Sequence, residues 1–148
     1  MKKFALILCI GFLGFSINAQ QVTAEKVDEN APVFKFETKV VNYGEIARNS
    51  DGLRVLKFTN VGKSPLIITN VKGSCGCTVP TSPKEPIMPG MEGEIEIKYA
   101  TNRIGPFSKT VTITSNASEP SVVISVKGKV LNDKDSEILL KKKTVVSQ

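Results

Sequence analysis

The residues best suited to chemistry are two cysteines separated by a single glycine, Cys75 and Cys77. They lie in the run Ser74-Cys75-Gly76-Cys77-Thr78. On a regular strand, residues i and i+2 point to the same face about 6.6 Å apart, at the far end of disulfide reach. Gly76 allows a kink that would bring the two sulfurs together. Three kinds of chemistry are open: a local disulfide, an exchangeable thiol pair, and a soft-metal site.

A soft-metal site here would favour Cu(I), because thiolates and thioethers are its preferred ligands. Met88 and Met91 flank Pro89-Gly90 and are close in sequence to the cysteines, so they complete the candidate set of Cys75, Cys77, Met88 and Met91. Methionines in a loop more often serve packing than ligation. We therefore expect no cofactor, and we keep a thiol-redox or Cu(I)-handling protein as the alternative function.

Histidine is absent from all 148 residues. This excludes Ser-His-Asp and Cys-His nucleophile systems, His-ligated zinc and two-His iron sites. The carboxylates of Glu92, Glu94 and Glu96 could supply acid–base chemistry, but their alternation with apolar residues predicts a solvated face. We therefore expect no catalytic residues and no enzymatic activity.

The N-terminus has the order of a secretory signal peptide. Met1-Lys2-Lys3 is followed by an apolar run to about Phe15 and by a small residue, Ala19, at a cleavage position. The run is shorter than the roughly 20 residues that a membrane helix needs. We predict cleavage after Ala19, so residues 1–19 are removed and the product is exported to the periplasm or the extracellular space, with no membrane span.

Cleavage also removes Lys2 and Lys3, so the formal net charge falls from +6 to +4. This excess is mild, and its residues are scattered apart from Lys141-Lys142-Lys143. A nucleic-acid-binding protein would concentrate basic residues on one face. We expect no nucleic-acid partner.

The rest of the chain divides into a polar linker at 20–32, a domain at 33–131 and a C-terminal tail at 132–148, for which a short docked element is the alternative. Within the domain, apolar and polar residues alternate with period 2 between turn-forming clusters, which predicts strands. Strands are expected at 33–36, 40–46, 54–60, 65–72, 92–99, 107–115 and 121–131, and the apolar run at 65–72 is typical of a central strand. About seven strands with no convincing helix between them predict an all-β, immunoglobulin-like β-sandwich.

No catalytic set can be assembled, whereas a sandwich offers sheet edges and clustered loops for binding. The longest predicted loop, residues 74–89, would be stiffened by prolines, which lowers the cost of ordering it on binding. The expected contact residues are Ser74, Gly76, Thr78, Pro80, Pro83 and Pro86. We therefore predict a non-enzymatic binding or scaffolding module whose partner is a protein or other cell-envelope material.

The sequence resembles a bacterial family known as domain of unknown function 1573 over residues 34–131. The resemblance rests on Tyr43-Gly44-Glu45-Ile46, on the run 58–68, on Ser74-Cys75-Gly76-Cys77-Thr78-Val79-Pro80 and on Pro89-Gly90. Tyr43 stands where the family pattern has Phe. The resemblance implies an exported immunoglobulin-like domain with no established activity. The sequence pattern is more distantly similar to major-sperm-protein-like and Hydin-type sandwich modules, which bind other proteins.

Overall fold

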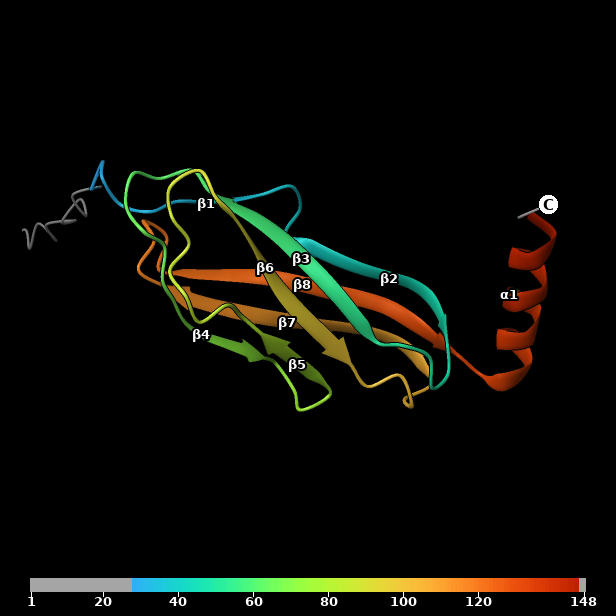
Figure 1. Cartoon of the computed structure of the whole chain (residues 1–148). Helices are drawn as coiled ribbons and strands as arrows, with labels where there is room; N and C mark the ends of the chain where they lie inside the picture. Colours follow the sequence, from blue (N-terminus) through green and yellow to red (C-terminus); the bar gives the residue numbers. More distant parts are fainter. Residues whose placement is uncertain (1–27, 147–148) are drawn as a thin grey trace, which may run out of the picture.

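The computed structural model of the chain describes residues 28–146 (Figure 1). The predicted signal peptide and residues 20–27 of the predicted linker lie outside the described residues. The elements in chain order are β1 (Phe34–Phe36), β2 (Val40–Ala47), β3 (Leu53–Asn60), β4 (Ile68–Gly73), β5 (Thr78–Thr81), β6 (Glu92–Tyr99), β7 (Gly105–Ser115), β8 (Ser121–Leu131) and α1 (Asp133–Val146). No helix within residues 28–146 is long and apolar enough to cross a membrane.

The strands form two sheets of four, in the orders β1-β3-β6-β5 and β2-β8-β7-β4. Neighbouring strands are antiparallel except for β2 and β8, which run parallel. The chain crosses from one sheet to the other at every connection except those between β5 and β6 and between β7 and β8, and one of these crossings lies between β4 and β5. The two sheets enclose one core, so the predicted immunoglobulin-like β-sandwich is confirmed.

Period-2 alternation accounts for that core. In β6, Ile95, Ile97 and Tyr99 are buried, whereas the three glutamates between and before them are exposed. β7 and β8 follow the same rule and bury rows of branched side chains. Since successive side chains point to opposite faces of a strand, one row of each strand lines the space between the sheets. The alternation of apolar and polar residues in the sequence therefore corresponds to the alternation of buried and exposed side chains in these strands.

β5 lies inside the segment for which we predicted one long loop. Its residues pair with the second half of β6 from Thr78↔Tyr99 to Thr81↔Glu96. The hydrogen bond from the N–H of Ala100 to the carbonyl of Cys77 sets the alternation along this ladder, so Pro80 faces away from β6. The missing N–H of Pro80 therefore breaks no ladder bond, and proline is tolerated in this edge strand.

The prediction that residues 65–72 form a central strand is wrong. β4 begins at Ile68 and is an edge strand, paired on one side with β7. The apolar run has a different cause: Leu66 precedes the strand and is fully buried, in a two-way main-chain pairing with Ile87. A segment buried beneath a loop and a strand buried between two neighbours can both appear in the sequence as a continuous apolar run.

The segments on either side of the sandwich, predicted as a linker and a tail, contain hydrogen bonds to the domain and a helix. Residues 28–32 of the predicted linker are held against the sandwich, because Ser118 donates its N–H to Pro32 and Ser64 donates its hydroxyl to Asn30. The C-terminal segment contains α1, which stands at the opposite end of the sandwich from residue 28 (Figure 1). Asn132 caps α1 by accepting the N–H of Asp135 at 2.9 Å.

An aromatic cluster bridges the two sheets at the α1 end. The rings of Tyr99 and Phe107 are stacked with centroids 3.7 Å apart, and Tyr43 meets Phe107 edge-on at 5.5 Å. The Tyr43 hydroxyl lies 2.9 Å from the carbonyl oxygen of Gly52 and 2.8 Å from that of Ile97. The hydroxyl that distinguishes Tyr43 from phenylalanine thus ties β2 to the opposite sheet.

Replacing Tyr43 with Phe removes a buried donor from two carbonyls, which is expected to cost about 1 kcal/mol of unfolding free energy at pH 7. Burial raises the pKa of Tyr43 from 10.0 to about 12, an effect partly offset by the nearby Arg54 guanidinium. The neutral hydroxyl therefore contributes its full stability below pH 10, and this contribution is lost as the pH rises through 12. Urea unfolding of both proteins across this range should show the advantage of the wild type shrinking; a constant difference would contradict the assignment.

Candidate functional site

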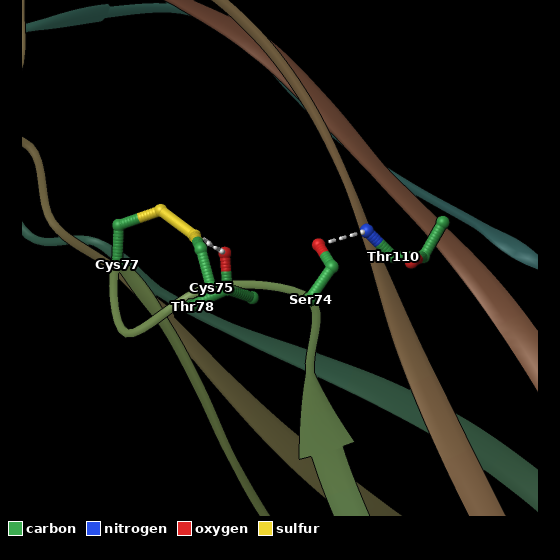
Figure 2. The surroundings of a disulfide bond; sticks show 5 residues. All are labelled: Ser74, Cys75, Cys77, Thr78 and Thr110. Atoms are coloured by element: carbon green, nitrogen blue, oxygen red, sulfur yellow. Dashed lines mark hydrogen bonds between the residues drawn. A yellow bond between two sulfur atoms is a disulfide. The ribbon is translucent and has the colours of Figure 1, made fainter.

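The two cysteines are joined by a disulfide in the turn between β4 and β5, with their Cα atoms 5.3 Å apart (Figure 2). Cys77 is buried and contacts the core, whereas Cys75 is half-buried. For the thiol-exchange alternative, this leaves only Cys75 with partial access from solvent. The pair lies where the chain crosses from one sheet to the other.

Hydrogen bonds fix the disulfide turn to both sheets. Ser74 donates its N–H to Thr110 of β7 at 2.8 Å, and its hydroxyl accepts the N–H of Thr110 at 3.1 Å (Figure 2). The turn closes with a bond from the N–H of Thr78 to the carbonyl of Cys75. The buried Thr78 hydroxyl lies 3.8 Å from the Cys75 sulfur and 4.0 Å from that of Cys77. The disulfide is thus positioned to brace the crossover between the sheets.

The glycine that sterically matters in this turn is Gly73 rather than Gly76. Gly76 is exposed, does not adopt a positive φ angle, and has open space where a Cβ atom would lie. A Cβ atom on Gly73 would overlap the carbonyl group of Thr78. The kink expected from Gly76 therefore forms with an ordinary backbone conformation, and the close approach occurs at the end of β4.

Replacing Gly76 with Ala should leave the unfolding free energy unchanged or raise it by about 0.5 kcal/mol, since only the unfolded chain loses freedom. Replacing Gly73 with Ala should lower it by about 2 kcal/mol or more, because the overlap involves main-chain atoms. Chemical denaturation of both variants, with the disulfide verified by mass, measures the difference. Equal losses in the two variants would show that the turn differs from this description.

The four candidate metal ligands are not brought together. The cysteines adjoin the end of β6, where Ala100 bonds to Cys77, whereas Met91 immediately precedes its start. A strand of eight residues spans about 26 Å, so the two pairs lie at opposite ends of β6 (Figure 1). The described residues also contain no group of three or more His, Cys, Asp or Glu side chains that could hold a metal ion. The shared Cu(I) site proposed from the sequence is not formed.

The predicted contact residues are divided among three settings. Ser74 and Gly76 belong to the disulfide turn, Thr78 and Pro80 to β5, and Pro83 and Pro86 to the loop before β6. Thr78 is buried and therefore unsuited to contact a partner. The longest stretch of the segment outside the sheets is the loop at 82–91, and most of its residues after Pro83 are exposed.

This loop and the start of β6 enclose a groove of about 450 Å³. It is lined by Pro83, Glu85, Pro86, Ile87, Met88, Met91, Glu92, Gly93 and Glu94. Ile87 is buried beneath it, whereas Met88 and Met91 are 54% and 59% exposed. The methionines first considered as metal ligands thus form part of an open, partly apolar surface.

The loop is positioned by Asn60, a fully buried residue at the end of β3. Its side-chain amide donates to the carbonyls of Ser64 and Ile87, each at 2.9 Å, and accepts the N–H groups of Val33 and Gly62. Its main chain bonds to Gly90 and Met91. From the sequence, Asn60 was expected only as the last residue of the strand at 54–60, where a turn begins. Asn is a common turn residue, and nothing local distinguishes a buried amide from an exposed one.

Replacing Asn60 with Ala should lower the unfolding free energy by about 3 kcal/mol, because buried main-chain groups lose their partners. Asn116 is a matched control: its amide also bridges two main-chain groups, Ile67 and Pro65, but it is exposed. Water can replace that amide, so Asn116→Ala should cost about 1 kcal/mol or less. Urea denaturation measures both, and similar losses would remove Asn60 from its central role.

Two facing four-stranded sheets in these orders define an immunoglobulin-like β-sandwich. The family described as "Protein of unknown function (DUF1573)" matches residues 34–130, and the chain belongs to that family. Among curated proteins, none matches this chain.

Solved structures share the fold at low sequence identity. A protein of unknown function from Porphyromonas gingivalis matches with a TM-score of 0.61 and 16% identity over 72% of this chain, which spans about half of that protein, 51%. The PapD-like domain 7 of human CEP192 matches with a TM-score of 0.60 and 6% identity, over 78% of this chain and 97% of that domain. The CsuC-CsuE chaperone-tip adhesion subunit complex of Acinetobacter baumannii matches with a TM-score of 0.52 and 12% identity, covering 67% of this chain and 52% of that one.

Proposed function

We propose that this protein is a non-enzymatic, exported binding module that contacts a partner protein in the cell envelope through the groove beside β6. The observation that carries the proposal is the exposure of Met88 and Met91 on a loop held by buried hydrogen bonds. Exposed thioether side chains adapt to varied apolar surfaces. A loop already held in place loses little conformational entropy when a partner binds.

The chemistry of the remaining residues supports a non-enzymatic role. The chain has no histidine, and Cys75 and Cys77 are joined to each other. The predicted signal peptide at residues 1–19 supports export to the periplasm or the extracellular space. The same fold occurs in a chaperone–adhesin assembly, which is consistent with a protein partner.

A photo-crosslinking amino acid placed at Met88 or Met91 should trap a partner in intact cells. The matched control is Val123, an exposed apolar residue of β8 in the other sheet, 54% exposed. We expect a discrete crosslinked species of higher mass from positions 88 and 91 and none from position 123, as read on denaturing gels. Equal labelling at all three positions, or none at 88 and 91, would contradict the proposal.

A further inference from the structure

β6 extends beyond its neighbour β5, which leaves part of its edge without a partner. β5 pairs with β6 only as far as Thr81↔Glu96. The residues from Glu92 to Ile95 therefore have β3 on one side and no strand on the other (Figure 1). This uncovered edge is one wall of the groove.

The main-chain groups along this edge point outward. Asn60 donates its N–H to the carbonyl of Met91, and the alternation of an antiparallel ladder then turns each odd-numbered residue of β6 toward β3. The N–H and C=O groups of Glu92 and Glu94 therefore face the position that β5 occupies further along. Among residues 28–146, no other residue forms a hydrogen bond with these groups.

The chain itself does not fill this place because of its prolines. Continuing the register of Thr81↔Glu96 would set Pro83 opposite Glu94. Pro83 has no N–H to donate, so the ladder ends and the chain leaves the sheet. It returns where Ile87 pairs with Leu66 in a separate bridge. β5, which pairs with β6 as far as Glu96, marks the line that an added strand would follow.

The groove is acidic in a chain whose formal net charge is positive, at +6. Glu85, Glu92 and Glu94 line it, and Glu94 already pairs with Lys57 of β3 at 3.2 Å. A strand added on the free side would place its alternate side chains beside Glu92 and Glu94, where opposite charges are favourable. The thioethers of Met88 and Met91 offer apolar surface for the stems of long basic side chains.

We propose that this groove binds an extended basic segment of the partner protein as an added β-strand beside Glu92–Ile95. Lysine or arginine at positions i and i+2 of the segment pairs with Glu92 and Glu94, and a small apolar residue at i+1 points toward Ile87. The inference rests on the proposed function and specifies its ligand. The opposing interpretation is that these carboxylates only discourage strands from pairing with a free edge.

The test uses the full chain with its disulfide intact and a labelled short peptide of alternating lysine and valine, with binding measured by fluorescence anisotropy. Glu92→Gln with Glu94→Gln should weaken binding about fivefold at low salt, and the effect should shrink as salt rises. Glu45→Gln is the matched control, because Glu45 and Glu94 are both strand residues, 54% exposed and ion-paired with a lysine. It should leave binding unchanged.

N-methylated peptides separate strand pairing from simple charge attraction. In the proposed register, the lysine amides face β6 and the valine amides face away. Methylation of the lysine amides should weaken binding about tenfold, the effect of roughly one main-chain hydrogen bond, whereas methylation of the valine amides should have little effect. Equal effects of the two methylations, binding that is as tight after the double substitution as before it, or no binding of the peptide would overturn the inference.

The two proposals fail in different ways. If the peptide does not bind but position 88 still crosslinks to a protein in cells, the basic-strand inference is wrong and the binding module stands. If crosslinking at positions 88 and 91 also fails, the proposed function is wrong. If the crosslinked species is a second copy of this chain, the added strand from a different protein is excluded.

Discussion

The candidate site depends on the hydrogen bonds of one buried side-chain amide, that of Asn60. It joins residues that are far apart in sequence, from Val33 at the entry of the chain to Ile87 in the loop before β6. An amide that is fully enclosed must satisfy its hydrogen bonds within the protein, because unpaired polar groups there are costly. This requirement holds the three segments around the amide together. Through Ile87 and Met91, it ties the groove to the sheet that ends at Asn60.

β6 connects the two features of interest and keeps them apart. Its end adjoins the disulfide turn, which braces a crossover between sheets, and its start forms a wall of the groove. The core row of Ile95 and Ile97 between them is fully buried, so the strand acts as a fixed spacer. The cysteine pair and the methionine pair, which the sequence suggested as ligands of one metal site, are consequently at separate places in the fold.

Most strands could be predicted because a half-buried strand carries its own signature. Glu92–Tyr99 and Ser121–Leu131 have the bounds expected from alternation alone. β5 could not be predicted, because its Pro80 is acceptable only in one orientation toward β6, and that orientation depends on a hydrogen bond formed by Cys77. The helix α1 was missed because capping by Asn132 is a weak signal where no clear apolar stripe follows.

Local patterns were enough to predict the class of fold, most residues of the core, the closeness of Cys75 to Cys77 and the family. Each of these follows from local spacing or from a continuous run of residues. The tertiary structure alone decided that β4 is an edge strand, that Asn60 is buried and that Met88 and Met91 are exposed far from the cysteines. It also decided that the edge of β6 at Glu92–Ile95 has no neighbour. Such facts depend on which strands lie side by side, and residues distant in the chain set that order through packing and hydrogen bonds that no local pattern records.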